Sequence, residues 1–199
     1  MTITIIDYKA GNLASVRKAV THLGYDSVLT GDPDAVRRAE RILLPGVGHF
    51  SATQRIADSG LKDAISDAIS RGVPFLGICV GMQWLYEGST ESPETEGLGL
   101  LRGRVERFES GMKVPHVGWN TMKPAAISRL LRGIPEQGFV YYTHSYRCPV
   151  VEGVVATTTY GETFAAAVEK GHVFGVQFHP EKSSEVGLQV LKNFFEVKA

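Results

Sequence analysis

The sequence has little of what marks a secreted, membrane-spanning or nucleic-acid-binding protein. Its 199 residues include only two cysteines, far apart in the chain, which argues against the disulfide framework of a small secreted domain. The 21 basic and 21 acidic side chains cancel, so the chain lacks the basic field that sequence-independent nucleic-acid binding requires. No apolar run approaches the roughly 18 residues of a membrane span, and residues 1–7 lack the features of a signal peptide. We therefore expect a soluble, cytoplasmic protein with no membrane or nucleic-acid partner.

What the sequence does have is an ordinary globular composition and a repeated strand–helix pattern. At roughly 100–200 residues per domain, its length predicts a single domain spanning residues 1–199. Strand-like runs at Thr2–Ile6, Arg41–Leu44 and Val73–Ile78 alternate with helical apolar spacing at Leu13–Leu23 and Leu61–Ile69. Repeated strand–helix units of this kind predict a doubly wound α/β sheet.

The pattern changes after Glu87. Residues 87–96 are acidic without a basic residue, and we expect them to form an exposed loop. A last helix is predicted around Val186–Phe195. Further strands are predicted at Val105–Phe108, Phe139–Thr143, Val154–Thr159, Phe164–Val168 and His172–Phe178. Because no linker-like segment interrupts these elements, we expect one mixed sheet.

Cys79 stands between two glycines, at a predicted strand end and before a helix. The spacing Gly77–Cys79–Gly81 is the thiol version of the nucleophile elbow, in which a sharp turn forces the nucleophile into a strained conformation. Small flanking residues avoid clashes in such a turn. The alternative is a buried, inert cysteine at the top of a core strand. The second cysteine, Cys148, has no glycine neighbours, and for it the inert interpretation is preferred.

His179 and Glu181 follow another predicted strand. Residues two apart in an extended segment project to the same side, so Glu181 could orient the imidazole of His179 as the carboxylate of a nucleophilic triad does. Two alternatives are half of a metal site, for which further ligands are missing, and a polar residue that ends a strand. The other five histidines have no comparable partner in the sequence.

A glycine turn could complete an acyl-transfer site. In the hydrolase elbow, the donors for the oxyanion are the N–H of the residue after the nucleophile and an N–H from a loop after a neighbouring strand. Here these would be Val80 and Val47, with Gly46 and Gly48 on either side of Val47. The alternative is an ordinary turn at a strand end; a phosphate loop is excluded because no Lys-Ser or Lys-Thr follows the glycines.

Together these motifs resemble the class I (triad) glutamine amidotransferases over essentially the whole chain. The segments that carry the resemblance are Asp7–Asn12, Pro45–Phe50, Gly77–Gln83, Pro115–Asn120, Thr143–Arg147 and His179–Glu181. They point to the histidine-biosynthesis branch, the glutaminase subunits of imidazole glycerol phosphate synthase. The resemblance implies a flavodoxin-like three-layer α/β fold with a central mixed, mostly parallel sheet, and implies neither cofactor nor metal.

The resemblance also implies site residues. Cys79 would attack the side-chain amide of L-glutamine, His179 would protonate the departing ammonia and Glu181 would orient His179. The oxyanion hole would be formed by Gly46, Val47, Gly48 and Val80. Substrate recognition would fall to Gln83, Glu91, His144, Ser145 and Tyr146.

By the same resemblance, ammonia would pass to a cyclase (β/α)8-barrel subunit in a heterodimer. The cyclase would make imidazole glycerol phosphate and aminoimidazole carboxamide ribotide. Asn12 and Trp119 would lie at the interface, with a core position as the alternative for Trp119. A glutaminase that runs alone wastes glutamine, so we expect weak activity without the partner and an oxyanion hole that the partner helps to order.

Two other functions fit part of the pattern. One is a stand-alone cysteine hydrolase of γ-glutamyl amides. The other is a flavodoxin-like redox-sensing module in which Cys79 is the reactive thiol. A sensor would not need the His179–Glu181 pair, so replacement of His179 separates it from a triad enzyme.

Overall fold

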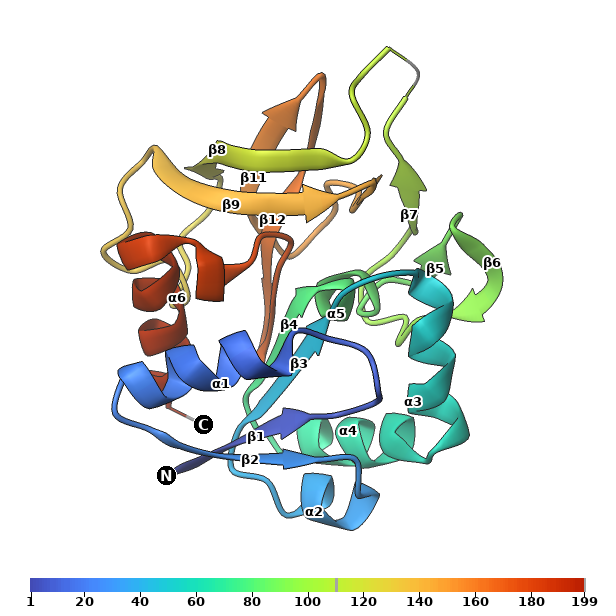
Figure 1. Ribbon diagram of the computed structural model, residues 1–199, viewed down its shortest axis with the longest axis vertical. Helices are drawn as coiled ribbons and strands as arrows, with labels where there is room; N and C mark the ends of the chain where they lie inside the picture. The colour runs from blue at the N-terminus through green and yellow to red at the C-terminus, as the bar shows by residue number, and fades with distance from the viewer. Residues whose placement is uncertain (110, 199) are drawn as a thin grey trace.

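A mixed sheet forms the centre of the structure, a computed structural model that describes residues 1–109 and 111–198. Its nine strands lie in the order β2-β1-β3-β4-β13-β12-β11-β8-β9 (Figure 1). They are β1 Thr2–Ile6, β2 Asp26–Thr30, β3 Ile42–Gly46, β4 Phe75–Cys79, β8 His116–Pro124, β9 Gly138–His144, β11 Val154–Tyr160, β12 Glu162–Lys170 and β13 Val173–Val176. Strands β2 to β13 of this order run parallel, and the pairings from β13 to β9 are antiparallel. The expected mixed α/β sheet is confirmed.

Helices cover both faces of the parallel half of the sheet (Figure 1). Alternate residues of β1 face opposite cores: Ile3 and Ile5 pack in the cluster that holds α1 and α6, and Ile6 packs in the cluster that holds α2, α3 and α4. The helices are α1 Leu13–His22, α2 Pro33–Arg37, α3 Gln54–Asp58, α4 Leu61–Ser70, α5 Val80–Gln83 and α6 Ser184–Glu196, with 3₁₀ turns η1 Phe50–Thr53 and η2 Pro180–Lys182. This gives the three layers that the family resemblance implied.

A second, four-stranded sheet corrects one expectation. Its order is β10-β7-β5-β6, formed by Tyr146–Arg147, Arg104–Arg107, Gly88–Ser89 and Ser92–Glu96. Residues 87–96 were expected to be an exposed loop, but most of them form the β5–β6 hairpin. Ser92 and Thr95 are buried there, and their hydroxyls lie 2.8 Å apart in a hydrogen bond. Because the hydroxyls satisfy each other, the hairpin buries polar residues that an apolar pattern does not reveal.

The elements that the sequence did not predict are short or lie at or next to the edge of the sheet. β2 is an edge strand whose Val28 and Leu29 are exposed, so it lacks the apolar alternation of a half-buried strand. β8 exposes Val117 and Trp119, next to the opposite edge. Within residues 1–109 and 111–198, no helix has the length and apolar character needed to cross a membrane.

Candidate active site

Cys79 lies at the carboxyl end of β4, where the chain turns sharply into α5. Its φ of 55° and ψ of −109° fall in a region that residues with a side chain seldom adopt. Lack of space explains the two glycines. A Cβ on Gly77 would overlap the backbone of Gly81, and a Cβ on Gly81 would overlap the carbonyl group of Leu44. The backbone therefore has the strained strand-to-helix turn expected from the sequence.

His179 and Glu181 follow the adjacent strand β13 and form a buried pair. The Nδ1 atom of His179 lies 2.9 Å from Oε1 of Glu181, and each side chain is 1% exposed. The sequence predicted an extended segment with both side chains on one side. Instead Pro180 begins the turn η2, which brings the carboxylate to the ring. The His179 backbone N–H donates to the carbonyl of Tyr141 at 2.9 Å, and this bond fixes the pair against β9.

The charges of Cys79 and His179 are coupled. Burial lowers the pKa of His179, but the interaction with Cys79, followed by that with Glu181, outweighs burial and raises the pKa to about 10. His179 is therefore an imidazolium at neutral pH. Its buried Nε2 atom has no hydrogen-bond partner among the described residues, which leaves that proton available toward Cys79.

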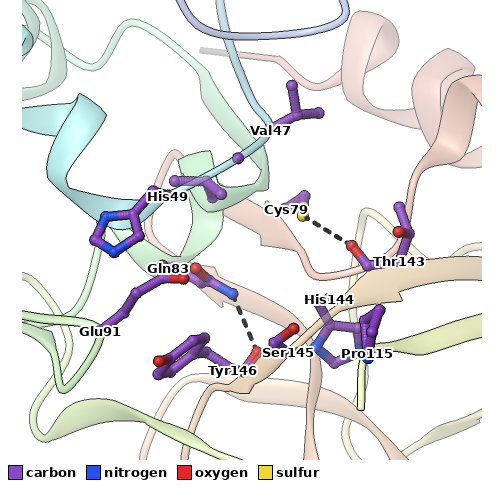
Figure 2. A pocket seen from close by; sticks show the side chains of 12 residues that line it. Val47, His49, Cys79, Gln83, Glu91, Pro115, Thr143, His144, Ser145 and Tyr146 are labelled. Atoms are coloured by element: carbon purple, nitrogen blue, oxygen red, sulfur yellow. Dashed lines mark hydrogen bonds between the residues drawn. The ribbon is translucent and has the colours of Figure 1, made fainter.

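A pocket of about 430 Å³ opens beside Cys79, a size typical of small-ligand sites. Figure 2 shows Cys79 facing Thr143 and Gln83 facing Tyr146. The lining residues are Val47, Gly48, His49, Cys79, Val80, Gln83, Glu91, Pro115, Thr143, His144, Ser145 and Tyr146. All five residues expected to bind substrate are among them. The pocket lies at the carboxyl ends of β3 and β4, where open α/β sheets place their ligands.

Two side chains of the pocket are held by the backbone around it. The Nε2 atom of Gln83 donates to the carbonyl of Tyr146 at 3.1 Å (Figure 2). The Oε2 atom of Glu91 accepts from the backbone N–H of Phe50 at 2.7 Å, and this bond ties Glu91 to the segment after the glycine turn. Only one Glu91 carboxylate oxygen makes this bond, so the other can face a cation.

The residues expected to form the oxyanion hole lie on two adjacent elements. Gly46 ends β3 and pairs in register with Cys79, so the glycine turn starts directly beside the nucleophile candidate. Val47 and Gly48 continue from Gly46 into the lining of the pocket, and Val80 begins α5 on the other side of Cys79. The structure thus brings all four residues next to Cys79.

His116 and His144 have no carboxylate partner like that of His179, but their two rings are hydrogen-bonded to each other, with His116 Nδ1 3.1 Å from His144 Nε2. His144 Nδ1 bonds the carbonyl of Tyr146 at 2.8 Å, so Nδ1 carries the proton and Nε2 accepts from His116. Burial lowers the pKa of His144 to about 3 and that of His116 to about 4. Both rings are therefore neutral at physiological pH, and His144 contacts the same Tyr146 carbonyl that accepts from Gln83.

The residues expected at a partner interface lie outside the pocket. Trp119 on β8 is 53% exposed, so the alternative of a core position is wrong. Asn12 lies half-buried at the N-cap of α1, where its side chain makes no capping hydrogen bond. Cys148 is fully buried, and burial raises the pKa of its thiol well above the usual value, in keeping with an inert thiol.

Among the described residues, no group of three or more His, Cys, Asp or Glu side chains is arranged to hold a metal ion.

The amino-acid sequence matches a known protein family and several of its members. A family model described as glutamine amidotransferase class-I matches residues 4–197. The imidazole glycerol phosphate synthase subunit HisH of Moorella thermoacetica is 49% identical over 198 residues, covering 98% of this chain and 94% of the relative. The subunit of the same name from Methanosarcina barkeri is 43% identical over 199 residues, covering 98% of each chain.

Solved structures share the fold. A chain of the PurLQS structure from Thermotoga maritima superposes with a TM-score of 0.78 at 21% identity, covering 98% of this chain and 97% of that chain. A crystal structure described as a glutamine amidotransferase gives a TM-score of 0.75 at 19% identity, covering 96% and 98%. At such identities these likenesses concern the fold alone.

Proposed function

Because the chain belongs to the class I glutamine amidotransferases, we propose that it is the glutaminase subunit of an imidazole glycerol phosphate synthase. It hydrolyses L-glutamine to glutamate and ammonia with Cys79 as nucleophile, His179 as acid and base, and Glu181 as the group that orients His179. The observation that supports this assignment best is the buried, charged His179, with Nδ1 on Glu181 and Nε2 left for the sulfur.

The first half of the reaction forms a thioester. The Cys79 thiolate attacks the side-chain carbonyl carbon of glutamine, and the carbonyl oxygen becomes an oxyanion held by the backbone N–H groups of Val47 and Val80. When the C–N bond breaks, the imidazolium of His179 gives its proton to the departing nitrogen, so that ammonia leaves. The γ-glutamyl group stays on the sulfur.

The second half of the reaction hydrolyses the thioester and regenerates the free cysteine. Neutral His179 takes a proton from water as the water oxygen attacks the thioester, and the thiolate leaves as glutamate forms. Glu181 holds the ring in one orientation throughout, and stabilises the imidazolium each time it forms. Gln83 and Glu91 bind the polar ends of glutamine, since a carboxylate such as Glu91 pairs with the α-ammonium group.

Ammonia is useful only while it stays unprotonated, so it passes to a second protein. The partner is a cyclase (β/α)8-barrel subunit that combines ammonia with a phosphoribulosyl formimino intermediate. Trp119 lies at the interface, since exposed tryptophans are common anchors at interfaces. Asn12 is proposed there by family likeness.

The test is ammonia release from glutamine, measured with and without the cyclase and its ligand. We expect weak release from the isolated chain, a large increase in the complex, and release lowered by at least about 10³-fold in Cys79→Ala and His179→Ala. The matched control is His172→Gln, a histidine just before the opposite end of β13, which should retain activity.

The outcomes also separate the rival functions. Glutamine turnover that ignores the cyclase would favour a stand-alone hydrolase of γ-glutamyl amides. Unchanged activity and unchanged Cys79 reactivity in His179→Ala would favour a redox sensor and contradict the triad.

A further inference from the structure

Gln177 is a fully buried polar residue between β13 and His179, and the proposed mechanism does not use it. Phe178, between them, packs in the core cluster with α1 and α6. In an extended backbone, residues 177 and 179 project to the same side. Gln177 Nε2 lies 3.7 Å from the Cys79 Sγ atom, and Cys79 also raises the pKa of His179.

The orientation of the Gln177 amide is fixed by a chain of hydrogen bonds that begins at a carbonyl. The Tyr146 carbonyl can only accept, so the atom of Gln83 that faces it at 3.1 Å is the NH₂ group. The same NH₂ group donates to Gln177 Oε1 at 3.2 Å. The Cys148 thiol donates to this oxygen as well, at 3.5 Å. With its oxygen held by two donors, Gln177 must turn its NH₂ group toward Cys79.

We propose that Gln177 is a positioning residue whose amide N–H donates to the Cys79 sulfur, and that Gln83 in the glutamine pocket keeps the amide turned that way. This inference rests on the glutaminase function proposed above and adds a residue to it. An N–H donor stabilises a thiolate more than a thiol, because hydrogen bonds to a charged acceptor are stronger. The same hydrogen bond fixes the direction of the sulfur.

The test follows the alkylation rate of Cys79 by iodoacetamide between pH 5 and pH 10, with the product counted by mass spectrometry. Cys148 is fully buried, so one label per chain reports Cys79. In Gln177→Met the donor is gone, and we expect the pH of half-maximal rate to rise by about one unit and kcat for glutamine to fall about tenfold. Gln177→Glu should raise the pH of half-maximal alkylation rate further, since a carboxylate then faces the sulfur.

A third variant tests the role of Gln83. Gln83→Met leaves Gln177 intact but removes the donor that fixes the Gln177 side-chain oxygen. The pH midpoint of the alkylation rate should therefore rise, by less than in Gln177→Met. The control Gln54→Met replaces an exposed glutamine on α3 and should leave the midpoint unchanged. Thermal unfolding followed by circular dichroism selects the folded variants for comparison.

The inference is overturned if the midpoint of folded Gln177→Met or Gln177→Glu equals that of the wild type, or if Gln83→Met has no effect. Failure of the proposed function is a different result. In that case the wild-type chain, even with the cyclase, releases no more ammonia than Cys79→Ala, while the alkylation profiles still report on Gln177.

Discussion

The charge of His179 depends on Cys79, and this dependence predicts a large change when the sulfur is removed. In the wild type the pKa of His179 is about 10, against an ordinary value of 6.5. At 1.36 kcal/mol per unit, the difference is a preference for the imidazolium on the order of 5 kcal/mol. Burial opposes it, and Cys79 supplies the largest favourable contributions, ahead of Glu181. In Cys79→Ala we therefore expect the pKa of His179 to fall by at least about one unit.

The measurement is an NMR titration of the imidazole Cε1–H signals between pH 5 and pH 11. His179→Gln identifies the signal, because that resonance alone disappears. Glu181→Gln is the comparison: it removes the last of the favourable contributions, so the pKa should fall by less than in Cys79→Ala. The reasoning is refuted if His179 titrates near 6.5 in the wild type, or if Glu181→Gln lowers its pKa more than Cys79→Ala does.

The same coupling predicts how stability changes with pH. A histidine whose folded pKa is raised stabilises the fold fully below 6.5, and this stabilisation is lost as the pH rises through about 10. The free energy of unfolding of the wild type, measured by urea denaturation, should therefore fall across that window. Cys79→Ala should show a smaller fall, and an equal fall in both proteins would contradict the assignment.

Three other substitutions test parts of the structure. Tyr8 is 3% exposed and its hydroxyl has no hydrogen-bond partner in the described residues, so Tyr8→Phe should raise the free energy of unfolding by about 1 kcal/mol in urea denaturation; a loss would show a missed partner. Gly81→Ala places a Cβ against the Leu44 carbonyl and should lower the free energy of unfolding by about 3 kcal/mol with loss of glutaminase activity; normal stability would contradict the clash. Trp119→Ala should change stability by less than about 0.5 kcal/mol but weaken binding of the cyclase by about 2 kcal/mol in calorimetry; unchanged affinity would remove Trp119 from the interface.

The parts of the site that depend on local geometry could be predicted from the sequence. A cysteine between Gly77 and Gly81, at the end of a buried strand, predicts a strained turn because only that turn needs both glycines. His179 and Glu181 lie two residues apart, and their contact was predicted although the turn that makes it was not. The parallel strands of the core could also be predicted, because strands buried on both faces are continuously apolar in sequence.

The parts that depend on distant segments could not be predicted. Gln177 lies 98 residues from Cys79 and 94 from Gln83, and no periodicity reports such a contact. The only signal in the sequence was that Gln177 lies two residues before His179, because residues two apart in an extended segment project to the same side. His116 and His144 are 28 residues apart and meet only because β8 and β9 pair with those two residues in register.

β9 shows why the antiparallel half of the sheet matters for the chemistry. Its Tyr141 carbonyl accepts from the His179 N–H, and the Thr143 carbonyl lies 4.0 Å from the Cys79 sulfur. Just beyond its end, the Tyr146 carbonyl holds Gln83. One segment therefore contacts the proposed base, the proposed nucleophile and the proposed substrate-binding amide, while its neighbour β8 exposes Trp119 opposite Tyr141. Tyr141 and Thr143 both lie on β9, so a displacement of the β8–β9 ribbon would alter the contacts to His179 and Cys79 together.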